Sequence, residues 1–276
     1  MSDVIDGTAT EAPFYLPVSD EVEVFLAAYD RRIPVLLKGP TGCGKTRFVE
    51  HMSWLLARAH GRDPAAGLIT VSCHDDLTSA DLVGRYLLSR DGTTWLDGPL
   101  TQAVRSGAIC YLDEVVEARK DTTVILHALT DHRRALPIER LGTTLPAHPD
   151  FLLVVSYNPG YQAAAKDLKP STRQRFMAIE FTYPSPELET EIIAHETSAD
   201  TATAEALAFL GHKLRGLDEA DVIEGPSTRL LVNVGSLIAD GISPRRACDV
   251  ALVQALSDDT DVQGAIRDVV DAVFAA

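Results

Sequence analysis

Residues 39–46 read Gly39-Pro40-Thr41-Gly42-Cys43-Gly44-Lys45-Thr46 and match the pattern G-x-x-x-x-G-K-[ST]. An apolar run over residues 33–37 precedes them, and an amphipathic helical pattern begins near Thr46. This order of strand, glycine loop and helix lets backbone N–H groups and a helix N-terminus converge on phosphate oxygens. Lys45 is expected to reach the β- and γ-phosphates of a nucleoside triphosphate, and the Thr46 hydroxyl to ligate Mg²⁺. A glycine turn that merely precedes a helix is disfavoured, because the motif is complete and has both flanks.

Two carboxylates follow a second apolar run, residues 108–112, as Asp113-Glu114. Such a run is typical of a buried parallel strand, whose carboxyl end delivers side chains to the binding edge of the sheet. Asp113 is expected to hold the Mg²⁺ through water, and Glu114 to polarise the water that attacks the γ-phosphate. An acidic pair is not needed for nucleotide binding alone, so it favours hydrolysis.

Further polar residues stand at strand ends and helix starts. Asn158 follows the apolar run 151–157, where an amide could hold the attacking water, although an Asn before Pro is also a common turn. Arg173 and Arg175 precede the strand pattern 176–181, away from their own phosphate loop. They would serve a neighbouring subunit's γ-phosphate or form a solvated basic pair, and spacing alone does not decide. Arg229 lies in the first turn of a helix, where a cation opposes the helix dipole and indicates an anionic partner.

The elements that must position these residues alternate between strand and helix. Strand patterns cover residues 33–37, 68–73, 108–112, 151–157 and 176–181. Two hairpins are predicted in addition, one with the Asp91-Gly92 turn and one around residues 139–142. Trp95 in the first hairpin would either be exposed and grip a polypeptide or pack against its own hairpin.

From Pro184 onward the pattern is helical, over residues 188–195, 202–214, 227–240 and 243–256. We therefore predict an α/β fold with a parallel P-loop NTPase core, two β-hairpin insertions and a small C-terminal helical lid. The expected parts are a disordered N-terminus (1–12), a nucleotide-binding domain (13–183), a helical lid (184–257) and an acidic tail or helix (258–276).

Two smaller signals have alternative interpretations. Tyr15 is a weak candidate for an adenine pocket, and core packing is favoured for it. The run His74-Asp75-Asp76 could hold a metal, but acids beside Ser and Thr after a strand more often cap a helix.

Composition narrows the class of protein. The chain has 276 residues, 46% hydrophobic and 24% charged, which suits a globular protein with a substantial core. A net charge of −15 argues against nucleic acid as the main partner. The four cysteines show no paired metal spacing, which indicates thiols in a reducing compartment. No leader pattern or apolar run of ~18 residues is present, so we expect neither secretion nor membrane insertion, and a cytoplasmic location.

The chain resembles AAA+ ATPases of the MoxR branch, in the CbbQ/NorQ/NirQ/GvpN group, over about residues 14–256. The resemblance rests on residues 37–50 around the phosphate loop, the Asp81-Leu82-Val83-Gly84-Arg85 run, residues 111–119 with the acidic pair, and residues 156–161 with Asn158. It implies that Asn158 is the sensor 1 residue, that Arg175 is the arginine finger with Arg173 beside it, and that Arg229 is the sensor 2 arginine of the lid. It also implies that both hairpins face the central pore of a ring.

Members of this group work as hexamers that, together with a von Willebrand factor A domain adaptor (CbbO/NorD-like), remodel a target metalloenzyme. The resemblance therefore implies ATP and Mg²⁺ as cofactors and a client that is either inhibited Rubisco, slightly favoured here by residues 74–76 and 168–176, or nitric oxide reductase. A nucleotide-gated assembly scaffold, as in gas-vesicle members, and a nucleic-acid motor are the rival functions.

Overall fold

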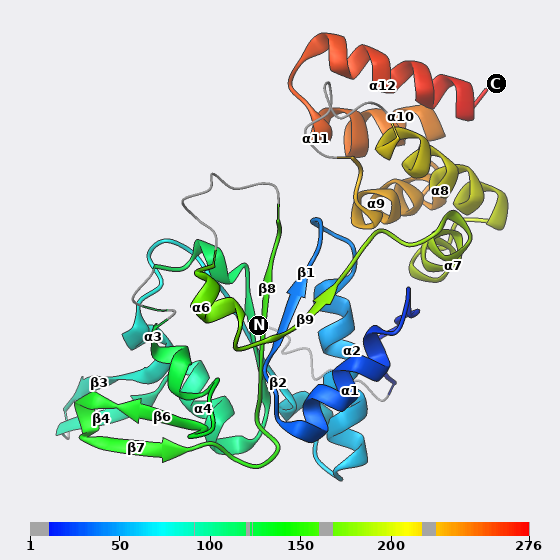
Figure 1. The fold of residues 1–276 in the computed structure, drawn as a ribbon. Coiled ribbons are helices and arrows are strands. Elements are labelled where there is room, and N and C mark those ends of the chain that lie inside the picture. The colour runs from blue at the N-terminus through cyan, green and yellow to red at the C-terminus, as the bar shows by residue number, and fades with distance from the viewer. Residues whose placement is uncertain are drawn as a thin grey trace. The chain divides into compact units, whose positions relative to one another are not determined.

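The structure is a computed structural model that describes residues 11–90, 92–119, 122, 124–159, 168–216 and 225–275. It forms two compact units (Figure 1). The first comprises the chain up to Gly39 and Lys45–Glu180, and the second comprises Pro40–Gly44 and the chain from Phe181 onward. The predicted disordered N-terminus lies almost entirely outside the described residues.

The first unit is built on a five-stranded parallel sheet with the strand order β2-β5-β8-β1-β9. Its strands are β1 (Val35–Lys38), β2 (Leu68–Ser72), β5 (Ile109–Asp113), β8 (Leu152–Tyr157) and β9 (Met177–Glu180). All five strand predictions are thus confirmed within two residues at each end. Because all the strands are parallel, the loops after β1, β5 and β8 lie at the same edge of the sheet. The order of the strands along the chain reverses beside β1, and ligands bind at such a point of reversal.

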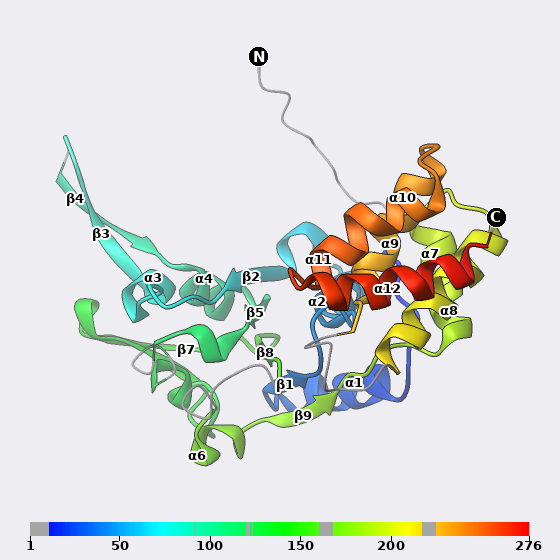
Figure 2. The ribbon, with the colours of Figure 1, turned by 90° about the horizontal axis from the view of Figure 1, so that it is seen from above.

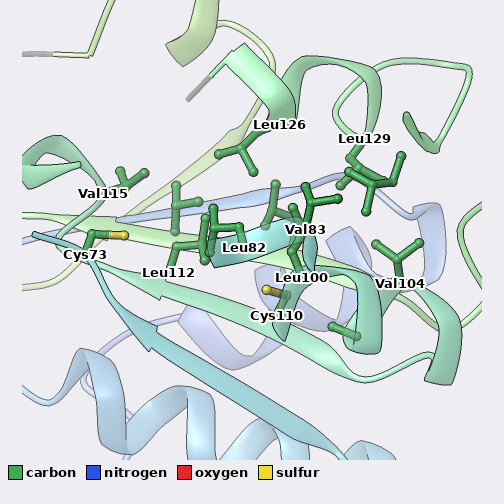
Figure 3. Packing of buried hydrophobic residues seen from close by; sticks show 14 of the residues in the cluster. Cys73, Leu82, Val83, Leu100, Val104, Cys110, Leu112, Val115, Leu126 and Leu129 are labelled. Carbon is green, nitrogen blue, oxygen red and sulfur yellow. The ribbon is translucent and has the colours of Figure 1, made fainter. Parts of the chain in front are cut away.

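Helices cover the sheet, because its strands are apolar on both faces. The helices of the first unit are α1 (Glu21–Arg31), α2 (Lys45–Ala59), α3 (Ser79–Val83), α4 (Pro99–Ser106) and α6 (Pro170–Arg173), with short 3-10 helices at Pro64–Ala66, Val115–Glu117, Ile125–Ala128 and Glu139–Leu141. Cys110 and Leu112 of β5 point to the face packed against α3 and α4, whose buried side chains include Leu82, Leu100 and Val104 (Figure 3). On α1 and α2, Phe25 and Phe48 are fully buried, with ring centroids 5.2 Å apart.

Both predicted hairpins are present and project from the same end of the first unit (Figure 2). The first pairs β3 (Gly84–Ser89) with β4 (Gly92–Asp97), and the second pairs β6 (Ala135–Ile138) with β7 (Thr143–Pro146). The structure favours the packed alternative for Trp95, whose indole N–H donates to Asp97 Oδ1 at 2.7 Å and whose ring lies against Tyr86. The exposed apolar side chains are instead Leu87, Leu88 and Leu96.

Two predictions differ from the structure in detail. The sequence pattern over residues 121–129 predicts a helix, and the described residues Thr122 and Val124 are α-helical, but the chain continues as a 3-10 helix at Ile125–Ala128. Asp121 itself lies outside the described part of the chain. The acids at 75 and 76 do not form the predicted cap of the following helix. Thr78 and Asp81 do so, in a reciprocal capping box at the start of α3.

The second unit is helical, as predicted. Its helices are α7 (Pro186–Glu196), α8 (Thr201–Arg215), α9 (Thr228–Ala239), α10 (Pro244–Cys248), a π-helical turn at Asp249–Val253, α11 (Gln254–Leu256) and α12 (Thr260–Val273). Ile266 and Val270 of α12 are buried in the core of this unit, together with Leu207 and Leu231. The C-terminal segment is therefore a packed helix. Among the described helices, none has both the length and the apolar content to cross a membrane.

Candidate nucleotide site

The phosphate loop has the backbone that its sequence predicts. Gly39, Gly42 and Gly44 have φ values of 151°, 68° and 99°, which side-chain-bearing residues rarely adopt. Lys45 opens α2 and is buried, and its ammonium donates to the Gly39 carbonyl at 2.9 Å. A second bond, 2.8 Å long, runs from the ammonium to Asn158 Oδ1 at the end of β8.

Asp113 ends β5 and accepts two hydroxyl hydrogen bonds on one oxygen. Tyr111 donates to Oδ1 at 2.7 Å, and Ser156 donates to the same atom at 2.5 Å. The Tyr111 hydroxyl also lies 3.4 Å from Thr46 Oγ1, so a phenol bridges the two residues predicted to hold Mg²⁺. Burial, reinforced by the Asp113 charge, raises the pKa of Tyr111 well above its usual value, which keeps the phenol protonated and able to donate.

Glu114 adopts a left-handed backbone conformation, with φ 55° and ψ 48°. This region costs a non-glycine residue about 1 kcal/mol or more, and such residues cluster at functional sites. The Glu114 N–H donates to Ser156 Oγ at 3.0 Å, which holds this conformation. Asn158 Nδ2 contacts Glu114 Oε1 at 3.5 Å. Asn158 therefore contacts both the Lys45 ammonium and the Glu114 carboxylate.

Lys45, Thr46, Asp113, Glu114 and Asn158 thus form one cluster. Its lysine and its two carboxylates fit a nucleoside triphosphate with a divalent cation, because the ammonium can balance phosphate charge while oxygens of Thr46 and Asp113 suit Mg²⁺. The positive φ values of the three glycines keep the loop backbone open to phosphate oxygens. Among the described residues, no group of three or more His, Cys, Asp or Glu side chains is placed to hold a metal ion.

The structure places Arg173 and Arg175 away from this cluster. Parallel pairing aligns Met177 of β9 with Val35 of β1, so Arg175 precedes the amino edge of the sheet, whereas the phosphate loop follows the carboxyl edge. Arg175 contacts the His127 carbonyl at 3.4 Å and Asp131 at 3.7 Å. Arg173 donates to the Leu168 carbonyl at 3.3 Å.

Arg229 is the second residue of α9 in the second unit, after the N-cap Ser227. Within the same unit, the Tyr183 hydroxyl donates to the carbonyl of Thr41 in the phosphate loop at 3.1 Å. Cys43 in that loop is buried. Pro40, like Thr41 and Cys43, belongs to the second unit.

Sequence reasoning missed Tyr111 and Ser156. Both stand inside apolar strand runs, and both are completely buried. The available signal was a hydroxyl placed two residues before a predicted site residue, on the same face of the strand. Tyr15, by contrast, has the structural role that was favoured for it, because its hydroxyl donates to Glu21 at 2.5 Å and its ring packs on Phe48.

A separate pocket of about 500 Å³ lies between the two hairpins. Trp95, Ile125 and Pro137 form part of its wall. None of the predicted nucleotide residues lines it.

The parallel sheet, the glycine loop before α2 and the acidic pair after β5 define a P-loop NTPase of the AAA+ class. A family model for the AAA domain (dynein-related subfamily) matches residues 34–176, and one for the CbbQ/NirQ/NorQ C-terminal region matches residues 189–273. A mutant of RuvB from Thermotoga maritima shares the fold, with a TM-score of 0.54 at 18% identity, covering 91% of this chain and 69% of that one.

Three relatives are much more similar in sequence. The chain is 57% identical to Protein CbbQ of Hydrogenophilus thermoluteolus over 95% of its own length and 96% of the relative. It is 56% identical to Protein NorQ of Paracoccus denitrificans, with 96% of each chain covered. It is 54% identical to the denitrification regulatory protein NirQ of Pseudomonas aeruginosa, over 94% of this chain and 96% of that one. The chain belongs to the CbbQ/NirQ/NorQ family of AAA+ proteins.

Proposed function

We propose that this protein is a Mg²⁺-dependent ATPase that works in a homo-oligomeric ring to remodel a client protein. The observation that carries the proposal is the cluster at the carboxyl edge of the sheet. There Asn158 joins the Lys45 ammonium to Glu114, while Asp113 is held beside Thr46 through Tyr111. A protein that only bound nucleotide would not need a carboxylate held in a strained conformation beside a lysine and an amide.

Each residue of the cluster has a distinct role in the proposed reaction. Residues 39–46 enclose the phosphates, and Lys45 neutralises charge on the β- and γ-phosphates. Thr46 and Asp113 hold Mg²⁺, which when bound neutralises charge developing on the phosphate oxygens. Glu114 accepts the proton of the attacking water, and Asn158 orients that water.

The substitution Glu114→Gln tests the mechanism. The amide keeps the size of the side chain and its contact to Asn158 but cannot accept the proton, so we expect ATP binding with a loss of turnover of about 100-fold or more. Binding is measured with a fluorescent ATP analogue and turnover by phosphate release. Undiminished hydrolysis in this variant would contradict the assignment of Glu114.

Arg173, Arg175 and Arg229 complete the site in this proposal. Arg175 acts on the nucleotide of a neighbouring subunit, with Arg173 beside it, and its position at the opposite edge of the sheet supports a role in trans. Arg229 responds to the γ-phosphate from the helical unit. A ring, expected to be a hexamer, supplies the neighbour.

The proposed client is a metalloenzyme, approached with a von Willebrand factor A domain adaptor. Rubisco carrying an inhibitory sugar phosphate is the leading target, and nitric oxide reductase is the alternative. Two relatives that are named denitrification regulatory proteins favour that alternative. The identities of 57% to CbbQ and 56% to NorQ do not separate the two targets. Mixing the protein, ATP and the adaptor with each stalled enzyme identifies the client. Recovery with Glu114→Gln protein would instead support a nucleotide-gated scaffold.

A further inference from the structure

A buried ion pair in the second unit has no part in the proposed chemistry. Glu189 of α7 is completely buried, and Arg215 at the end of α8 is 14% exposed. The guanidinium and the carboxylate make two parallel hydrogen bonds, each 2.8 Å long. A buried pair of this kind is weak support for stability, because desolvation offsets the attraction, whereas it fixes geometry well.

This pair holds the start of α9 at two positions just before Arg229. Arg215 Nε donates to the carbonyl of Pro226 at 2.8 Å, just before the N-cap. The buried hydroxyl of Thr228 donates to Glu189 Oε1 at 2.6 Å, directly before Arg229. The backbone that carries Arg229 is therefore attached to a single rigid pair of charges.

The same arginine lies against the aromatic ring that contacts the phosphate loop. The Arg215 guanidinium carbon is 4.0 Å from the ring centroid of Tyr183, a cation–π contact. The Tyr183 hydroxyl donates to the Thr41 carbonyl, and residues 40–44 belong to this unit. A continuous set of contacts thus runs from Thr41 through Tyr183, Arg215 and Glu189 to Thr228.

We infer that Glu189 and Arg215 are positioning residues that set the place of Arg229 and couple it to the phosphate loop. Neither Glu189 nor Arg215 touches the nucleotide. They act by fixing the backbone of the first turn of α9. ATP and ADP are then distinguished by Arg229, whose backbone is held in place. The inference rests on the proposed function, because it takes Arg229 to respond to the γ-phosphate.

The test uses Thr228→Val, which keeps the shape of the side chain and removes the bond to Glu189. Dissociation constants for fluorescent ATP and ADP analogues with Mg²⁺ are measured for the full chain, in the native and in the Arg229→Ala background. We expect Thr228→Val to weaken ATP binding about fivefold or more while changing ADP binding little, and to have no further effect when Arg229 is absent. Arg215→Lys, which cannot make the two parallel bonds, should act in the same direction.

Thr197→Val is the matched control. Thr197 also makes a side-chain hydrogen bond, 2.8 Å to the Ile193 carbonyl, but this bond is local to the end of α7. Its substitution should leave the ratio of ATP to ADP affinity unchanged, and thermal unfolding checks that every variant is folded. Equal weakening of ATP and ADP binding by Thr228→Val, or an effect that persists without Arg229, would overturn the inference. An Arg229→Ala variant with normal ATP binding would instead contradict the role proposed for Arg229 itself.

Discussion

Ser156 connects the two acidic residues through a single hydroxyl. It donates to Asp113 Oδ1 and accepts from the Glu114 N–H, and it is completely buried. Removing the hydroxyl leaves the Glu114 N–H without this acceptor and releases one hold on Asp113. Each lost bond to a charged or buried group is worth about 1–3 kcal/mol, so we expect Ser156→Ala to lower kcat about 10- to 100-fold.

Steady-state ATP hydrolysis is measured over a range of Mg²⁺ concentrations. The Mg²⁺ concentration required for half-maximal activity should rise, because the Asp113 carboxylate has lost one of its hydrogen bonds. Ser53 provides the control, because it is a buried serine of α2 whose hydroxyl has no hydrogen-bond partner among the described residues. Ser53→Ala should leave both kcat and the Mg²⁺ requirement unchanged. A normal Mg²⁺ requirement and kcat in Ser156→Ala would remove the role given to this hydroxyl.

The buried thiols allow a prediction about reactivity and pH. Burial raises the pKa of Cys73 to about 12, with the charges of Asp113 and Glu114 adding to the effect, and burial also raises the pKa of Cys110 and of Cys248 to about 12. These thiols therefore stay protonated at pH 8 in the folded protein, and we expect them to react with a thiol reagent only after unfolding. Counting fast-reacting thiols in native and urea-unfolded protein checks this.

The same shifts give a direction for stability. A thiol whose folded pKa is raised binds its proton more tightly in the native state, so its contribution is complete below pH ~9 and is lost as the pH rises from ~9 toward ~12. Rapid modification of Cys73 in folded protein at pH 8 would contradict the burial on which both statements depend.

The sequence is sufficient to predict the site residues whose position relative to a strand end is fixed. Lys45, Asp113 and Asn158 follow strands whose apolar runs are unmistakable, and parallel strands bring their carboxyl ends to one edge. Tyr111 and Ser156 could not be assigned in the same way. Whether a hydroxyl inside a strand meets a carboxylate depends on the register between β5 and β8, and that register comes from packing rather than from either strand alone.

At the scale of elements, the first hairpin has exposed apolar side chains that its own packing does not require. Leu88 is 90% exposed, whereas Trp95 is packed on Tyr86. The resemblance implies that this hairpin faces the pore of a ring, where it would contact the client. Leu88→Ser should then reduce client recovery several-fold and leave basal ATP hydrolysis unchanged, because Leu88 lies in the hairpin and not in the nucleotide cluster.

Ile242→Ser in the second unit is the matched control, because Ile242 is also an exposed apolar residue, at 41%. Recovery of the stalled client and client-free phosphate release are measured side by side for both variants. If the Leu88→Ser variant and the unchanged protein recover the client equally well, this hairpin does not contact the client.

The two hairpins also show where local patterns are informative. The Asp91-Gly92 turn and the alternation around it predict the first hairpin, because such a turn matches the twist of two antiparallel strands. The 3-10 helix at Ile125–Ala128 was not foreseen, because its buried Leu126 satisfies a helical pattern as well as a tighter turn does. The buried pair of Glu189 and Arg215 joins residues 26 positions apart, and no short-range pattern could have revealed it.

At the scale of the whole molecule, one subunit has every group of the proposed reaction except Arg175, which lies away from its own phosphate loop. Within the described residues, the Arg175 guanidinium contacts the His127 carbonyl at 3.4 Å and the Asp131 carboxylate at 3.7 Å. Both contacts are long, so little free energy opposes the movement of this guanidinium to a phosphate of another subunit. A strand of four residues spans about 13 Å, which is too far for a side chain at the amino edge to reach the phosphate loop beyond the carboxyl edge.

This arrangement predicts complementation between two inactive variants. Glu114→Gln protein lacks the base and keeps Arg175, whereas Arg175→Ala protein lacks the arginine and keeps Glu114. Each alone should hydrolyse ATP about 100-fold more slowly than the unchanged protein. In mixed rings, a site with intact Glu114 can face a neighbour with intact Arg175, so phosphate release by the mixture should exceed the sum of the two separate rates.

Arg245→Ala, which removes an exposed arginine paired with Asp271, is the control and should hydrolyse ATP normally alone and in mixtures. Rates that are merely additive, with mixed assembly shown by two-colour labelling, would mean that Arg175 does not act across a subunit boundary.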